Sequence, residues 1–153
     1  MFTQKEASAL RQQFWTAFGQ YMLPVKGAEG EKVNWVNYRT GEKDVYFRMQ
    51  ADAKMASVSI DVAHKDASLQ QIYFEQFVQF RGLLEAETGE EWTWQLHTTD
   101  EHSRTISRIA NVTTGVNIFR QEDWPALISF FKPRIVALDA FWSQVKYGFE
   151  TLR

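Results

Sequence analysis

The segment of residues 55–88 changes its hydrophobic period in the middle, and we expect its neighbours to be organised around it. In its first half every second position up to His64 is apolar, while the positions between are small or polar and include Asp61, which predicts a β-strand with one buried face. In its second half apolar residues recur every three or four positions, which predicts an amphipathic helix. Asp66 or Ser68 can cap that helix at the change of period. A strand should therefore lead directly into a helix packed against it.

The same two periods place the remaining elements. A helical period recurs in two further segments, residues 3–23 and 123–152. A strand period recurs in four, residues 33–38, 45–51, 91–97 and, less regularly, 105–112. Pro133 is expected to break or kink the last helix. The prediction is a single α+β domain over residues 1–153 in the order α-β-β-β-α-β-β-α, with a mainly antiparallel sheet packed by helices whose inner faces are aromatic.

Composition narrows the possible functions. The chain of 153 residues is long enough for one substantial core, and its 12 Phe and 6 Trp predict that rings fill much of it. The absence of cysteine excludes disulfides, thiolate metal sites and cysteine catalysis. The sequence shows neither a signal-peptide pattern nor an apolar run of about 18 residues, so we expect no membrane segment and a cytoplasmic location.

Two carboxylates on neighbouring predicted strands are candidates for a metal site. Asp44 begins one strand and Asp61 lies on the polar side of the next, and carboxylate oxygens suit a magnesium ion that activates water for phosphodiester cleavage. The element order resembles that of the restriction-endonuclease-like fold, whose signature adds a lysine two residues after the second acid. Ala63 stands at that position here, so Lys65 or His64 would have to replace the lysine. The alternative is a solvated sheet face and a turn, each carrying one aspartate.

The charge distribution raises a second possibility. The net charge is −2, yet residues 66–101 hold eight acidic residues and one basic residue, whereas residues 102–120 hold arginines and no acid. Arg48, Arg104 and Arg108 are candidates for a cationic sheet face that contacts nucleic-acid phosphates. The alternative is that these arginines pair with the acidic residues of the chain.

Several longer stretches together resemble a known family. They are FWTAFGQYM, VNWVNYRTGEKDVYFRM, YFEQF, EEWTWQLH and QEDWPALISFFKPRIVALDAFW. They resemble an uncharacterised bacterial domain-of-unknown-function family, and the resemblance covers essentially the whole chain. Members of that family also occur as the C-terminal module of proteins whose front half resembles restriction-type nucleases. The resemblance implies an association with DNA processing or defence, and it carries over no catalytic residues.

Three functions follow from these observations. The first is a non-catalytic accessory or interaction domain without a cofactor, which binds a protein partner or forms a homodimer through its tryptophan-rich sheet or its C-terminal helix. The second is a magnesium-dependent nuclease of the restriction-endonuclease-like type, with Asp44 and Asp61 as metal ligands and Lys65 as the charge stabiliser. The third is a domain that contacts DNA phosphates through Arg48, Arg104 and Arg108.

Overall fold

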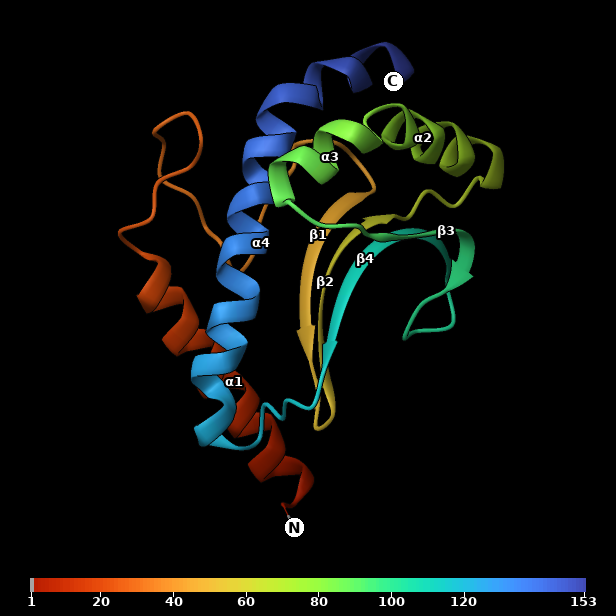
Figure 1. Ribbon diagram of the computed structural model, residues 1–153. Helices are drawn as coiled ribbons and strands as arrows, with labels where there is room; N and C mark the ends of the chain where they lie inside the picture. The colour runs from red at the N-terminus through yellow and green to blue at the C-terminus, as the bar shows by residue number, and fades with distance from the viewer. Residues whose placement is uncertain (1) are drawn as a thin grey trace.

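The computed structural model describes residues 2–153, which form an open antiparallel sheet with helices on one of its faces (Figure 1). In chain order the elements are α1 (Gln4–Met22), β1 (Val45–Ala51), β2 (Met55–Val62), α2 (Ala67–Gln79), α3 (Arg81–Thr88), β3 (Thr93–Thr99), β4 (Thr105–Thr114), the 3-10 helix η1 (Gln121–Asp123), α4 (Trp124–Val145) and the 3-10 helix η2 (Lys146–Leu152). The strand order across the sheet is β1-β2-β4-β3. The predicted α+β class and antiparallel sheet are confirmed.

One face of the sheet and the helices share the hydrophobic core. Figure 1 shows α4 running beside the strands, with α1 crossing it and with α2 and α3 above the upper end of the sheet. Val58 and Ile60 of β2 are completely buried on this side. Aromatic rings fill much of the space between the elements, for example Phe77 of α2 and Phe149 of η2, whose ring centroids lie 4.6 Å apart. The apolar alternation of β2 therefore faces the helices, as predicted, and Asp61 faces the other way.

The predicted strand at residues 33–38 is wrong. These residues belong to an irregular segment between α1 and β1, residues 23–44, which we call the strap. The alternation of apolar and polar residues here comes from single side chains that pack into the core. Trp35 is buried and donates its indole N–H to the carbonyl of Val25 (2.9 Å), and Tyr38 stacks on Phe47 with ring centroids 5.0 Å apart. The strap contributes side chains to the core without pairing with β1, so the predicted order loses one strand.

The predicted helix at residues 67–88 is interrupted. Phe80 (φ −100°, ψ 13°) leaves helical geometry between α2 and α3. At the start of α2 the Asp66 side chain accepts a hydrogen bond from the N–H of Leu69 (3.0 Å), so Asp66 is the cap. The change of period after β2 therefore begins a helix where the sequence predicted one.

The longest helix, α4, is central to the core. Pro133 lies inside α4 and does not end it, although proline removes one helical hydrogen bond. Phe131 and Ile135 on either side of the proline are completely buried, so packing along the whole helix offsets that loss. Although α4 is rich in apolar residues, neither it nor another helix within residues 2–153 has the length and apolar character needed to cross a membrane.

The pairing of β3 with β4 is irregular at one point. The sequence showed its less regular strand pattern in residues 105–112, which belong to β4, but the irregularity lies in β3. The register shifts between Gln95 and Thr98, so the extra residue belongs to β3. His97 at this point has φ +50° and donates its backbone N–H to the Ser107 hydroxyl (3.0 Å). The side chain of Ser107 thus replaces part of the ladder where β3 bends.

Candidate functional site

Polar side chains gather on the face of the sheet opposite the helices, which we call the open face. By strand register its residues are Tyr46, Arg48 and Gln50 of β1, Met55, Ser57, Ser59 and Asp61 of β2, Arg108, Ala110 and Val112 of β4, and Thr93 and Gln95 of β3. Tyr46, Asp61, Arg108 and Gln95 form one row, because each is the register partner of the next. Directly opposed side chains on neighbouring strands start about 5 Å apart. Asp61 and Arg108 are therefore brought into contact by the pairing of β2 with β4.

Asp61 is the centre of an ion network on this face. Its Oδ1 accepts a hydrogen bond from Arg108 Nε (2.8 Å) and its Oδ2 accepts one from Arg108 Nη2 (2.9 Å), which makes a bidentate pair. Arg48 Nε lies 3.4 Å from Asp61 Oδ2. The second edge of the Arg108 guanidinium donates to Glu101, from Nη1 to Oε1 (2.8 Å) and from Nη2 to Oε2 (3.3 Å). Positive and negative groups thus alternate in the order Arg48, Asp61, Arg108, Glu101.

The inner and outer parts of this network differ in burial. The Asp61 side chain is only 1% exposed although no helix covers it, whereas the Glu101 side chain is 43% exposed. A buried carboxylate is tolerated when it is paired and hydrogen-bonded. Hydrogen bonds from Arg108 hold the pKa of Glu101 at about 2, and those to Asp61 raise the pKa of Arg108 above its usual value. Arg108 and Glu101 therefore keep opposite charges at neutral and mildly acidic pH.

The turn that carries Glu101 is held by its neighbour Asp100. The buried Asp100 carboxylate accepts hydrogen bonds through Oδ1 from the backbone N–H groups of His102 and Arg104, both at 2.9 Å. Its Oδ2 accepts from Arg104 Nε (3.1 Å), and the Asp100 N–H donates to the Arg104 carbonyl (2.9 Å). None of these hydrogen bonds uses the Glu101 side chain, so the shape of the turn does not depend on it.

A groove of about 740 Å³ lies along the open face. Its volume is within the range of ligand-binding clefts. Gln50, Ser57 and Gln95 line it beside Arg108, and it continues around the β1-β2 turn to Arg11 of α1. Arg108 and Glu101, which are hydrogen-bonded to each other, both belong to this lining. The groove therefore offers hydrogen-bonding groups around one guanidinium.

Within residues 2–153, the residues predicted for a magnesium site have different contacts. Asp61 is paired with Arg48 and Arg108. The Asp44 carbonyl accepts a hydrogen bond from the N–H of Ala63 (2.8 Å), and the charge of its carboxylate opposes the lowering of the His64 pKa. Lys65 is exposed after the end of β2, and no ion pair within residues 2–153 joins it to Asp61. Across the same residues no group of three or more His, Asp or Glu side chains is placed to hold a metal ion.

The predicted arginine face forms in part. Arg48 and Arg108 lie on the two sides of Asp61, as neighbours on one face. Arg104 lies in the adjoining turn, where it pairs with Asp100 and leaves much of its guanidinium exposed. Each of the three arginines has a carboxylate partner, which is the alternative that the sequence left open.

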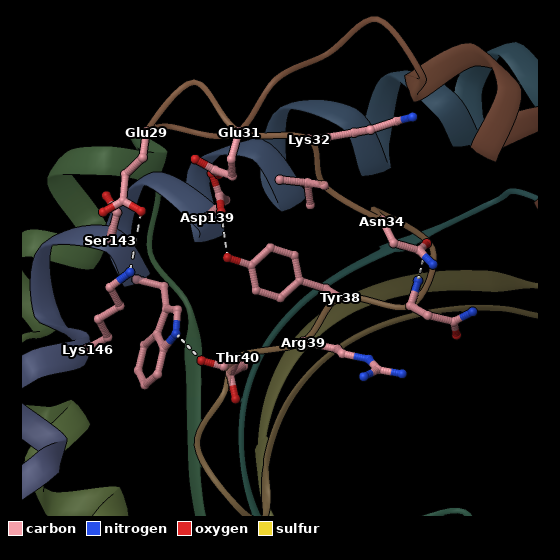
Figure 2. Close-up of a pocket in the computed structure, with 13 residues that line it drawn as sticks. Glu29, Glu31, Lys32, Asn34, Tyr38, Arg39, Thr40, Asp139, Ser143 and Lys146 are labelled. Carbon is pink, nitrogen blue, oxygen red and sulfur yellow. Dashed lines mark hydrogen bonds and ion pairs between the residues drawn. The ribbon is translucent and has the colours of Figure 1, made fainter.

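A second hollow, the strap pocket, lies between the strap and α4 (Figure 2). It has a volume of about 310 Å³. Figure 2 shows Tyr38 pointing across it to Asp139 of α4, with Glu31 beside them, while Lys32 and Arg39 turn away. The Tyr38 hydroxyl donates to Asp139 Oδ1 (2.5 Å), and the N–H of Ala28 donates to Oδ2 (2.7 Å). Burial is the main cause that raises the pKa of Tyr38, and the hydrogen bond to Asp139 adds to it, so the phenol keeps its proton.

The contacts of the strap pocket attach the strap to α4. Both Asp139 oxygens are bonded to the strap, and the Trp142 indole N–H donates to the Thr40 carbonyl (2.8 Å). Lys146 pairs with Glu29 at the edge, 3.4 Å apart. We call the two Asp139 hydrogen bonds to Tyr38 and Ala28 the clamp. The sequence did not predict it, although one signal was available, because Asp139 is an acid next to the apolar stripe of the last helix. We interpret the strap pocket as structural, because its buried carboxylate has its partners within the chain.

His64 occupies a buried position at the end of β2. Its ring lies 4.2 Å from that of Tyr73, centroid to centroid, and its Nδ1 is buried without a hydrogen-bond partner among residues 2–153. The Tyr73 hydroxyl donates to the buried Glu42 (3.0 Å), which also pairs with Arg153. Burial lowers the pKa of His64, the carboxylates of Asp44 and Glu42 oppose that shift, and Lys43 adds to it.

Because His64 is buried, we expect the free energy of unfolding to decrease in acid. Since the folded-state pKa of His64 lies below its unfolded value, the unfolded chain binds a proton more readily, and stability is expected to fall as the pH drops below about 6.5. The variant His64→Phe should lose less stability between pH 7.5 and pH 5.5, measured as the urea midpoint at each pH. His102→Gln, which alters an exposed histidine, serves as the control. An equal acid loss in His64→Phe and the wild type would contradict the prediction.

Fold and site together define an α+β domain with one face of its sheet covered by helices and an arginine–carboxylate network on the other. Comparison with family models matches residues 10–146 to the domain of unknown function DUF4268. The chain belongs to this family, which confirms that part of the predicted resemblance. No curated protein and no solved structure matches the chain. The bacterial origin and the link to restriction-type nucleases stay predictions.

Proposed function

We propose that this protein is a non-catalytic interaction module that binds an acidic segment of another protein on the open face of its sheet. The observation that carries the proposal is the bidentate pairing of Asp61 with Arg108. Both oxygens of the Asp61 carboxylate accept hydrogen bonds from Arg108, with Arg48 beside them, so this carboxylate orients a guanidinium toward the groove and already has cationic partners on both oxygens. The arrangement supports recognition of an anion and speaks against the nuclease hypothesis.

The side chains around Arg108 are of the kinds found in protein interfaces. Tyr46, Met55 and Val112 are exposed on the open face, beside the partly buried Arg48 and Arg108. Aromatic residues, methionine and arginine are enriched in the cores of protein interfaces, and arginine is frequent among the residues that dominate binding energy. An apolar surface around one oriented guanidinium therefore fits a peptide with apolar side chains and a carboxylate.

The charge pattern favours an acidic protein segment over a nucleic acid. Nucleic-acid binding depends on several basic groups that neutralise successive phosphates. Here Arg48, Arg104 and Arg108 each have a carboxylate partner, and the whole chain carries a net charge of −2. One or two carboxylates can be accommodated at such a site, whereas a long polyanion would be repelled by the acidic residues around it.

The open face is preferred to the two surfaces that the sequence suggested for a homodimer. Trp92 is buried, and Trp94 faces the helix side, where its ring packs against Phe74 and lies under the Arg81 guanidinium. The inner residues of α4 are buried in the core. We place the module in bacteria and in DNA processing or defence because of the family resemblance alone, and the cytoplasmic location stays a prediction from the sequence.

Selection of peptides tests the proposal. A library of random twelve-residue peptides is displayed and selected on the immobilised wild-type protein, and selected peptides are titrated by fluorescence anisotropy. We expect enrichment of peptides with Asp or Glu beside apolar residues, and at least tenfold weaker binding to Val112→Glu, which places a negative charge and a longer side chain on the open face. The matched control is Leu23→Glu, also an exposed apolar position, at the end of α1.

Four outcomes would overturn the proposal. One is the absence of enriched peptides, and another is binding that Leu23→Glu weakens as much as Val112→Glu. The third is magnesium-dependent cleavage of plasmid DNA that Asp61→Asn abolishes, which would establish the nuclease instead. Oligonucleotide binding that is steeply salt-dependent, in place of peptide binding, would also contradict it and favour the phosphate-contacting alternative.

A further inference from the structure

We infer that Glu101 is an internal competitor for the partner: the carboxylate of the bound segment takes the place of Glu101 on the second edge of Arg108. The inference rests on the proposed function and assigns the atoms that recognise the acidic group. It also assigns an autoinhibitory role to the turn between β3 and β4.

The two edges of the Arg108 guanidinium have different surroundings. The edge formed by Nε and Nη2 is fixed to Asp61, a residue of the neighbouring strand that is almost completely buried. The edge formed by Nη1 and Nη2 is turned to Glu101, whose side chain is partly exposed and comes from a turn. A guanidinium edge binds any carboxylate in the same two-point geometry. The first edge therefore orients Arg108, and the second is the one that a ligand can reach.

When the Glu101 side chain turns away from Arg108, the remaining ion network has an unbalanced positive charge. Without Glu101 the network consists of Arg48, Arg108 and Asp61, which together carry a net positive charge. This excess would face a groove of about 740 Å³ whose lining includes Gln50, Ser57 and Gln95. A partly buried cation without a counter-ion is unfavourable, so the vacated position attracts an anion. Glu101 supplies that anion when no partner is bound.

The exchange requires only a rotation of the Glu101 side chain. Asp100 holds the turn through hydrogen bonds to the backbone of His102 and Arg104, and these remain when Glu101 turns away. The departing carboxylate reaches water directly, because the residue already lies at the surface. One charged pair is exchanged for another of the same kind, so a ligand must compete with a carboxylate that is already in place. Removal of Glu101 should therefore strengthen binding.

A titration with small anions tests the inference without a known partner. The protein labelled with nitrogen-15 is titrated with sodium acetate, and separately with inorganic phosphate, at constant ionic strength, and the Arg108 Nε–Hε resonance is followed. We expect acetate to bind Glu101→Ala at least tenfold more tightly than the wild type. Glu101→Gln, which loses the charge and can still accept a hydrogen bond from Arg108, should show an intermediate gain. The matched control is Glu122→Ala, whose carboxylate lies 3.9 Å from the exposed Arg120, its ion-pair partner within residues 2–153, and which should leave binding unchanged.

Each outcome has a defined meaning. An Arg108 resonance that responds to acetate no more strongly in the folded Glu101→Ala or Glu101→Gln protein than in the wild type would overturn the inference. A stronger response to phosphate than to acetate would overturn the assignment of a carboxylate and indicate a phosphate-bearing ligand. If the anion experiment fails while selected peptides remain sensitive to Val112→Glu, only this inference is lost. If Arg108 binds acetate as expected and no peptide is enriched, the proposed function fails and the anion site stands.

Discussion

Replacing Asp61 with alanine is expected to reduce the free energy of unfolding by about 3–5 kcal/mol, the usual loss when one member of a buried ion pair is removed. Arg108 would lose both hydrogen bonds of its inner edge, and Arg48 would lose its carboxylate neighbour. Two cations would then lie side by side with only Glu101 to balance them. Urea denaturation followed by circular dichroism measures the change, and Glu122→Ala, at an exposed position, is the control.

A double variant separates the ion pair from a general effect of burial. Replacing both partners of a buried pair by apolar residues of similar size is often nearly neutral, whereas removing one is not. The double variant Asp61→Leu/Arg108→Met should therefore be more stable than Asp61→Ala. If Asp61→Ala unfolds at the same urea concentration as the wild type, the ion network does not stabilise the fold. The inference that Asp61 orients Arg108 would then be wrong.

Replacing Asp139 with alanine is expected to reduce the free energy of unfolding by about 3 kcal/mol. Two hydrogen bonds to a charged acceptor are lost, from the Tyr38 hydroxyl and from the Ala28 N–H, and each such bond contributes on the order of 1.5–3 kcal/mol. The loss should be concentrated in the strap. Hydrogen exchange at the Ala28 amide is therefore expected to accelerate more than exchange in the sheet, and the urea midpoint gives the overall change.

Tyr38→Phe is the matched control for this prediction. It removes one of the two donors and keeps the ring that stacks on Phe47, so it should be clearly less destabilising than Asp139→Ala. An Asp139→Ala variant with wild-type exchange at Ala28 would contradict the role of the clamp. In that case the hydrogen bond of Trp142 to Thr40 would be sufficient to hold the strap.

The local patterns of the sequence predicted the elements on which the fold depends. The alternation before residue 63 and the helical spacing after residue 67 predicted β2 and α2, because side-chain direction in a strand or helix repeats with a fixed period that needs no knowledge of distant residues. The same reasoning placed Asp61 on the polar side of its strand. It failed at the strap, where alternation reflects Trp35 and Tyr38 packing against the core, and periodicity alone cannot separate such a segment from a strand.

The candidate site could be predicted only in its parts. Arg48, Arg108 and Asp61 were each singled out, but their assignment to one network required the register of β2 against β1 and β4. Glu101 was counted as one charge in an acidic segment, and nothing in its local sequence indicates that it reaches Arg108 across the end of a hairpin.

The sequence by itself determined the α+β class, the alternation of β2 and the face on which Asp61 lies, since these depend on residues close together in the chain. Only the tertiary structure decided that Asp61 binds Arg108, 47 residues away, and that Asp139 holds Tyr38, 101 residues away. The physical reason is that a carboxylate of given sequence context can bind a metal ion, an arginine or a tyrosine, and its partner is selected by the chain segments that packing brings beside it.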